Sequence, residues 1–136
     1  MFEYRRKVNY YETDKMGITH HSNYVRWMEE ARIAFLDHLG HGYAQLEAEG
    51  LASPVLAVEC QYKRPTTFND EIKIVVSVEK YNEIRITFRY GIMKNDTDEL
   101  VAIGKTEHCF LDKTGRPIVA KKRLPKLDLL IKEFIK

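Results

Sequence analysis

The chain has 136 residues, of which 44% are hydrophobic and 31% are charged, and its 22 basic and 20 acidic residues give a net charge of +2. This composition indicates a globular domain rather than a disordered chain, and the nearly balanced charge argues against a nucleic-acid-binding surface. No run approaches the roughly 20 apolar residues of a membrane span, and residues 1–10 lack the apolar centre of a signal peptide. We therefore expect one cytoplasmic domain over residues 1–136, with Cys60 and Cys109 as reduced, buried thiols.

The first part of the chain predicts a strand, a loop and a long helix. Residues 3–10 form the expected strand, and residues 12–17 are polar and end at Gly17, which can adopt turn conformations that other residues resist. From Ser22 to Leu39 the apolar residues recur at helical spacing, so we predict a helix with Ser22 as its N-cap. A second, shorter helix is expected around residues 43–49.

After Gly50 the hydrophobic period becomes two, which is typical of strands. We predict strands near residues 56–63, 72–79, 84–92 and 100–111, arranged as an antiparallel meander, and a C-terminal amphipathic helix that starts at Pro125. The apolar stripe of the long helix needs a cover, which one face of an antiparallel sheet can supply. The sequence therefore predicts an α+β fold in which a sheet curls around a central helix. The last strand is apolar on both faces, and we expect its second face to meet another subunit.

Residues 10–24 are the strongest candidates for chemistry. Asp14 lies in the loop before the long helix, whose first backbone N–H groups are free and lie at the positive end of the helix dipole. A carboxylate beside free amides suits acyl transfer, because it can attack a carbonyl or activate water while the amides at residues 17–21 hold the oxyanion. A thioester substrate suits these groups, because its thiolate is a good leaving group that needs no strong general acid. A metal site at Asp14, His20 and His21 is not expected, because adjacent histidines in an extended segment point apart and no fourth ligand is evident.

The run Tyr-Tyr-Glu-Thr-Asp at residues 10–14 is followed by Gly17, His21 and the pair Asn23-Tyr24. This motif resembles the signature of the 4-hydroxybenzoyl-CoA thioesterase family, and Glu29, Ala31 and Arg32 match the family's helix pattern. The resemblance covers residues 3–125 or so. It implies the hotdog fold, with a five-stranded antiparallel sheet wrapped around one long helix. It also implies homodimers that often pair into homotetramers, an acyl-CoA substrate, and no metal or organic cofactor.

The resemblance also assigns roles to individual residues. Asp14 matches the catalytic aspartate, which acts as nucleophile or general base, and His21 matches the position whose backbone N–H helps to form the oxyanion hole and whose side chain could assist. Gly17 matches the loop glycine beside the thioester, and we expect His20 at the surface or in the pocket wall. Asn23 and Tyr24 match the start of the helix and are expected to shape the pocket.

Two departures from the family pattern are the pair Lys15-Met16, where many members have small residues, and the pair Asn69-Asp70, where Gly-Asp is frequent. The first could alter the acyl pocket. Basic residues could meet the phosphates of coenzyme A, and the candidates are Lys63, Arg64, Lys122 and Arg123.

We therefore expect a homo-oligomeric thioester hydrolase that cleaves acyl-CoA to a free acid and coenzyme A. Two alternatives stay open, namely a thioesterase for acyl groups on acyl carrier protein and a non-catalytic module that binds acyl-CoA. The preferred acyl chain, and the choice between dimer and tetramer, depend on packing that one chain's sequence does not define.

Overall fold

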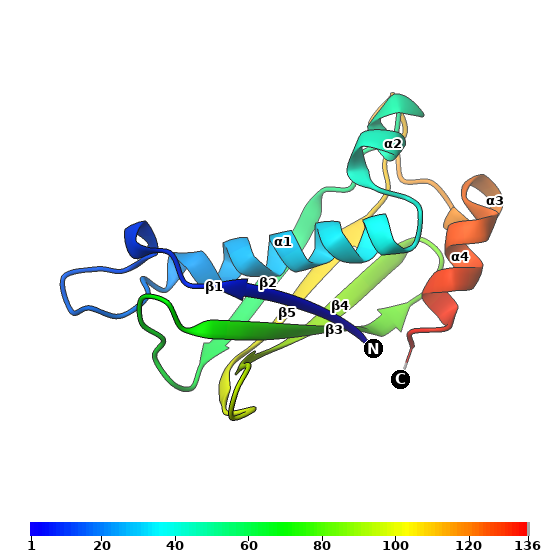
Figure 1. Ribbon diagram of the computed structural model, residues 1–136. Coiled ribbons are helices and arrows are strands. Elements are labelled where there is room, and N and C mark those ends of the chain that lie inside the picture. Colours follow the sequence, from blue (N-terminus) through cyan, green and yellow to red (C-terminus); the bar gives the residue numbers. More distant parts are fainter. Residues whose placement is uncertain (136) are drawn as a thin grey trace.

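The computed structural model describes residues 1–135 and shows a curved sheet that packs on one long helix (Figure 1). In chain order the elements are β1 (Phe2–Lys7), the 3-10 turn η1 (Tyr10–Glu12), α1 (Ser22–His38), α2 (Tyr43–Ala48), β2 (Val55–Tyr62), β3 (Glu71–Tyr81), β4 (Arg85–Lys94), β5 (Leu100–Cys109), α3 (Ala120–Arg123) and α4 (Pro125–Lys132). Within residues 1–135, no helix has the length and apolar character needed to span a bilayer.

The five strands form one antiparallel sheet in the order β1-β3-β4-β5-β2. The predicted α+β fold, a five-stranded antiparallel sheet around one long helix, is confirmed. The predicted meander of four strands is wrong for β2, which lies at the far edge beside β5 rather than beside β3. The connections at residues 82–84 and 95–99 are tight enough to make hairpins, whereas residues 63–70 are long enough to cross the end of the sheet.

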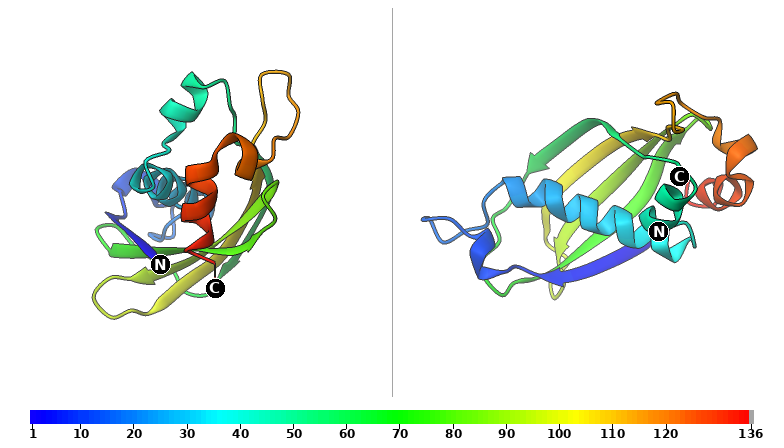
Figure 2. Two further views of the ribbon diagram at one scale, coloured as in Figure 1. Left: turned by 90° about the vertical axis from the view of Figure 1, so that its right-hand side faces the viewer. Right: turned by 90° about the horizontal axis from the view of Figure 1, so that it is seen from above.

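The main core lies between α1 and the concave face of the sheet (Figure 2). Trp27, Met28 and Phe35 of α1 are fully buried there, and burial of each such side chain stabilises the fold by roughly 1.5–3 kcal/mol. The helix approaches β5 closely at Gly104, where an added Cβ would lie 2.2 Å from the Met28 sulfur. A larger residue at position 104 would therefore require the Met28 side chain to move.

The edge strand β2 is poorly covered. Strand alternation predicts one buried face, but Val55, Leu56, Val58 and Tyr62 are each between 44% and 48% exposed. This strand is an edge of the sheet and pairs only with β5 among the described residues. Cys109 is buried as predicted, whereas Cys60 on β2 is only half-buried. An apolar strand with a free edge is therefore left on the surface.

The C-terminal helices cover the end of the sheet farthest from the β1–α1 loop (Figure 2). Tyr81 of β3 donates a hydrogen bond to Asp128 of α4, and Lys132 forms ion pairs with Asp128 and Glu83, both at 2.9 Å. A main-chain hydrogen bond also attaches the C-terminal segment to β3, because the Val78 N–H donates to the Phe134 carbonyl at 3.2 Å. The amphipathic helix predicted from Pro125 is confirmed and is attached to β3.

Candidate active site

The loop between β1 and α1 closes at its base, where Asp14 lies. Thr13 and Thr19 form an antiparallel bridge, the Asp14 N–H donates to the Ile18 carbonyl, and the Gly17 N–H donates to the Asp14 carbonyl. Gly17 has a φ of 76°, a left-handed conformation in which a side chain is strained, so the predicted need for glycine at this turn is met. The half-buried Asp14 carboxylate accepts the Met16 N–H through Oδ1 at 2.8 Å.

The start of α1 lies directly beside this base. The helix begins at Ser22, so the prediction that Ser22 is the N-cap is wrong by one residue, and His21 takes that position without a capping side-chain bond. His20 supplies the side-chain contact instead, because its Nδ1 lies 3.3 Å from the Ser22 nitrogen and 2.9 Å from Ser22 Oγ. The exposed His20 ring also stacks on the His21 ring, with 4.3 Å between the ring centroids.

Few of the backbone amides proposed to hold an oxyanion are available. The Gly17 N–H bonds to Asp14, the Thr19 N–H bonds to the Thr66 carbonyl, and the His20 N–H bonds to the Glu12 carbonyl. Among residues 1–135, only the N–H groups of Ile18 and His21 in this segment have no acceptor. The His21 N–H also lies at the positive end of the α1 dipole. It is therefore the main oxyanion donor that remains of those predicted at residues 17–21.

Glu12 connects the loop to the rest of the fold, and the sequence analysis did not identify it. Its side chain is 4% exposed and accepts hydrogen bonds from Arg6 at 2.6 Å, from Trp27 Nε1 at 2.8 Å and from the Asn9 N–H at 2.8 Å. Arg6 also pairs with Glu30 at 2.5 Å. The spacing Asn9-x-x-Glu12, a capping-box pattern, was the available signal in the sequence.

Two tyrosines pack beside the start of α1. Tyr24 is buried and its hydroxyl lies 3.0 Å from Thr66 Oγ1, while Tyr62 at the end of β2 donates to the His21 carbonyl at 3.2 Å. The two rings meet edge to face at 5.3 Å. Burial raises the pKa of both hydroxyls, so each is protonated and able to donate at neutral pH. Tyr24 thus packs against Tyr62 at the helix start, and its role in a pocket stays a prediction.

The two departures from the family pattern have simple structural settings. Lys15 and Met16 occupy the exposed tip of the loop, and Met16 is 75% exposed. Asn69 has a φ of 70°, a left-handed conformation that glycine adopts freely and asparagine tolerates better than most residues. Asparagine therefore preserves this turn where the family often has glycine.

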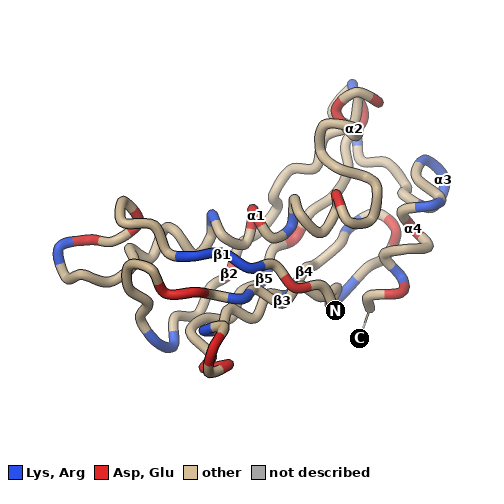
Figure 3. The backbone as a smooth tube through the Cα atoms, viewed as in Figure 1, with Lys and Arg blue, Asp and Glu red and all other residues tan. Residues whose placement is uncertain are grey.

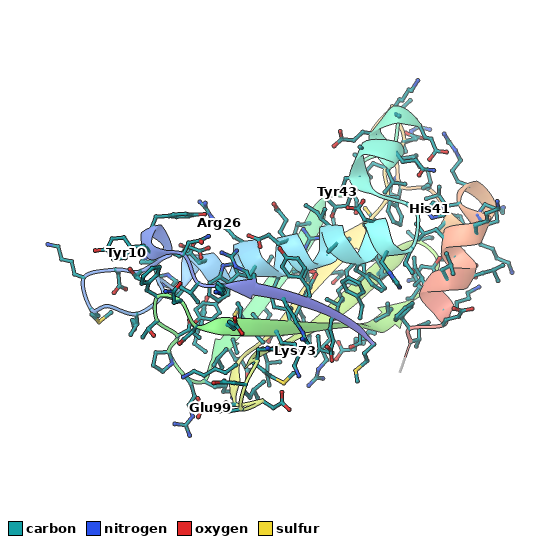
Figure 4. All side chains as sticks on the ribbon, viewed as in Figure 1. Tyr10, Arg26, His41, Tyr43, Lys73 and Glu99 are labelled. Carbon is teal, nitrogen blue, oxygen red and sulfur yellow. The ribbon has the colours of Figure 1, made fainter. Side chains whose placement is uncertain are left out.

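The candidate basic residues lie in two separate places. Lys63 and Arg64 follow directly after Tyr62, and both of their N–H groups donate to the Val101 carbonyl. Lys122 and Arg123 lie in α3, near the other end of α1 (Figure 3). In Figure 4, the label Tyr10 marks the end of the molecule with the β1–α1 loop, whereas the labels His41 and Tyr43 mark the opposite end, at α2. Because 17 helical residues span roughly 25 Å, the two pairs lie near opposite ends of α1 within one chain, with Lys63 and Arg64 following the Tyr62 that contacts the helix start.

The segment that carries the half-buried Asp14 carboxylate is thus hydrogen-bonded to the segment that carries the free His21 N–H, and Tyr24 and Tyr62 pack at the helix start. The Arg64 side chain pairs with Glu99 at 3.8 Å. The part of the chain that the structure describes contains no cluster of three metal-ligating side chains. This arrangement can activate a nucleophile or water and hold a negatively charged oxygen.

Comparisons with known proteins identify the family. Residues 8–132 match the model of the thioesterase-like superfamily. A crystal structure of a hypothetical protein from Aquifex aeolicus is 37% identical with a TM-score of 0.86, and the match covers 96% of this chain and 98% of the other. The DHNA-CoA thioesterase of Staphylococcus aureus is 32% identical with a TM-score of 0.90, over 96% of this chain and 88% of that chain. The acyl-CoA thioester hydrolase YbgC of Escherichia coli O6:H1 is 27% identical over 93 residues, which are 68% of this chain and 69% of the relative. This chain belongs to the thioesterase-like superfamily.

Proposed function

We propose that this protein is an acyl-CoA thioesterase that hydrolyses the thioester to a free carboxylic acid and coenzyme A. The names of the Staphylococcus aureus and Escherichia coli relatives support this activity. One structural observation carries the proposal. The segment that bears the Asp14 carboxylate is hydrogen-bonded to the segment that bears the free His21 N–H, through the Glu12 carbonyl and the His20 N–H at 2.8 Å.

The chemistry follows from these two groups. Asp14 either adds to the thioester carbonyl or takes a proton from a water molecule that adds there. The developing oxyanion accepts a hydrogen bond from the His21 N–H, and loss of one such donor typically costs about 10²–10³-fold in rate. The carbon–sulfur bond then breaks, and the thiolate of coenzyme A leaves and takes up a proton. If Asp14 acts as nucleophile, water hydrolyses the acyl anhydride in a second step.

The assembly is part of the proposal. The exposed apolar edge of β2 suits antiparallel pairing with the same strand of a second copy, which would extend the sheet into a homodimer. Antiparallel pairing reverses the second strand, so it would bring the α3 end of one copy toward the Asp14 end of the other. Lys122 and Arg123 could then join Lys63 and Arg64 in binding the phosphates of coenzyme A. We further propose pairing of dimers into a homotetramer, a cytoplasmic location, membership of the 4-hydroxybenzoyl-CoA branch, and catalysis without a metal or organic cofactor.

The substitution Asp14→Asn tests the function. Asparagine can still accept the Met16 N–H, so we expect the fold to persist while kcat for acyl-CoA hydrolysis falls by about 10²–10⁴-fold. The assay uses a panel of short, long, branched and aromatic acyl-CoA thioesters, followed by carrier-protein thioesters. Asp112→Asn is the matched control, because Asp112 also accepts the N–H two residues ahead at 2.8 Å but lies in another turn.

The outcomes separate the claims. Absence of acyl-CoA hydrolysis by the wild-type protein would contradict the proposed function. Wild-type turnover by Asp14→Asn would leave the activity standing and remove Asp14 from the mechanism. A preference for carrier-protein thioesters would show that acyl carrier protein, rather than coenzyme A, carries the acyl group of the substrate.

A further inference from the structure

Asn23, in the first turn of α1, connects the two segments of the site through its side-chain amide. Its Nδ2 donates to the Glu12 carbonyl at 3.0 Å and to the His20 carbonyl at 3.1 Å. A primary amide nitrogen has two hydrogens, so one donor atom can make both bonds. The two acceptors belong to different segments, because Glu12 precedes Asp14 whereas His20 precedes His21.

The bond to His20 sets the direction of the free amide. The His20 carbonyl and the His21 N–H belong to one planar trans peptide, in which they point to opposite sides. The carbonyl is held toward the helix because it also accepts the backbone N–H of Asn23 at 3.0 Å. The His21 N–H must therefore point out of the helix N-terminus.

The bond to Glu12 sets the position of the carboxylate segment. Glu12 is itself anchored by Arg6, Trp27 and Asn9, and its carbonyl accepts both the Asn23 side chain and the His20 N–H. Only Thr13 separates this fixed residue from Asp14. Asn23 thus joins a rigid support on the Asp14 side to the peptide that carries the free donor.

We propose that Asn23 is a positioning residue that fixes the Asp14 segment relative to the His21 N–H. This inference rests on the proposed function. Asn23 acts through the two reacting groups and does not itself need to touch the substrate. Substitution of Asn23 should therefore change kcat rather than KM, because the alignment of a reacting carboxylate and an oxyanion donor matters most in the transition state. Misplacement of such groups by about 1 Å can lower the rate roughly 10²-fold.

The first test compares Asn23→Ala with Asn82→Ala. Asn82 is a matched control because its side chain also makes two hydrogen bonds to the main chain, at 3.0 and 2.7 Å, in the turn between β3 and β4. We expect Asn23→Ala to lower kcat by about 10–100-fold with KM changed by less than about threefold. Asn82→Ala should keep wild-type kcat even where its melting temperature falls as much as that of Asn23→Ala.

The second test places Asn23→Ala in the Asp14→Asn background. If Asn23 acts by aligning Asp14, the additional fall in kcat is clearly smaller than the fall that Asn23→Ala causes in the wild-type background. A fully additive loss, an unchanged kcat in Asn23→Ala, or an effect on KM alone would each overturn the positioning role. These results are distinct from failure of the function, which would appear as a wild-type protein that hydrolyses no acyl-CoA.

Discussion

Glu12 and Asp14 are two residues apart in the sequence and have opposite surroundings. Both carboxylate oxygens of Glu12 are occupied by donors from β1, α1 and the main chain, and the side chain is almost fully buried. Asp14 is half-buried, and among the described residues only its Oδ1 has a hydrogen-bond donor. A fully bonded carboxylate anchors the chain, whereas a carboxylate with a free oxygen is able to react. The surroundings, rather than the residue type, separate the two roles.

The anchoring role of Glu12 predicts a large effect on stability. Replacement of a buried charged partner typically costs about 3–5 kcal/mol, and we expect Glu12→Gln to fall at the lower end of that range because Arg6 keeps its pair with Glu30. Urea denaturation measures the change. Glu3→Gln is the control, since its pair with Arg5 is exposed and should contribute less than about 1 kcal/mol. Equal, small losses in both variants would show that Glu12 is not an anchor.

At the scale of elements, β2 differs from the other strands. It and β1 are the two edge strands, each with a partner on one side only, but β1 is rich in charged residues whereas the apolar side chains of β2 are 44–48% exposed. Proteins usually protect a strand edge of this kind with charges, prolines or a cover, because exposed apolar edges promote association. The sequence of β2 has one charged residue, Glu59, so self-association through this edge is the arrangement that we propose.

This proposal predicts that a charge on the edge dissociates the assembly. Val58 is 46% exposed, and the substitution Val58→Lys would bury an ammonium group against a second copy. We expect sedimentation to change from a dimer or tetramer to a monomer, with the circular dichroism spectrum unchanged. Leu129→Lys is a suitable control, because Leu129 is 65% exposed and lies on α4, which is attached to β3 rather than to β2. An unchanged mass for Val58→Lys would exclude β2 as the subunit contact.

At the scale of the whole molecule, a chain of polar groups crosses the core. Arg32 of α1 donates to Tyr43 of α2 and to Tyr90 of β4, and Tyr90 and His108 both bond to Thr106 of β5. Within residues 1–135, every buried side-chain nitrogen or oxygen has a hydrogen-bond partner. Burial, and then the charge of Arg32, lower the pKa of His108 to about 3. His108 is therefore neutral in the folded protein.

This shift predicts loss of stability in mild acid. Between pH 6.5 and about 3 the unfolded chain binds a proton at His108 and the folded chain does not, so the free energy of unfolding falls as pH falls. At about 1.4 kcal/mol per pH unit, His108 should account for a loss of about 2 kcal/mol between pH 7 and pH 5. Urea denaturation at constant protein concentration measures this change. The variant His108→Gln should lack this contribution, whereas His38→Gln should retain it. The same pH dependence in wild type and His108→Gln would contradict the buried, neutral state.

Much of the local structure followed from side-chain periodicity and turn residues. The helical spacing from Tyr24 to Leu39 gave α1 to within one residue of each end, and the alternation around Ile74 and Phe88 gave the hairpin β3–β4. These features are local, since 3.6-residue and two-residue periods are read directly along the chain. Asp14, His21 and Asn23 could be named as candidates because they lie in one contiguous motif that resembles a family signature, and their roles stay predictions.

The tertiary structure decided what depends on distant residues. The position of β2 beside β5 depends on which strand pairs with it. The hydrophobic alternation along a strand does not identify that partner strand. The anchoring of Glu12 by Arg6 and Trp27, and the contact of Tyr62 with His21, join segments that the sequence keeps apart. Which amides at the helix start stay free depended on Thr66 as well, more than 40 residues away in the chain. Local preference selects the elements, but only the packing of those elements determines which polar groups are already paired and which remain available to a substrate.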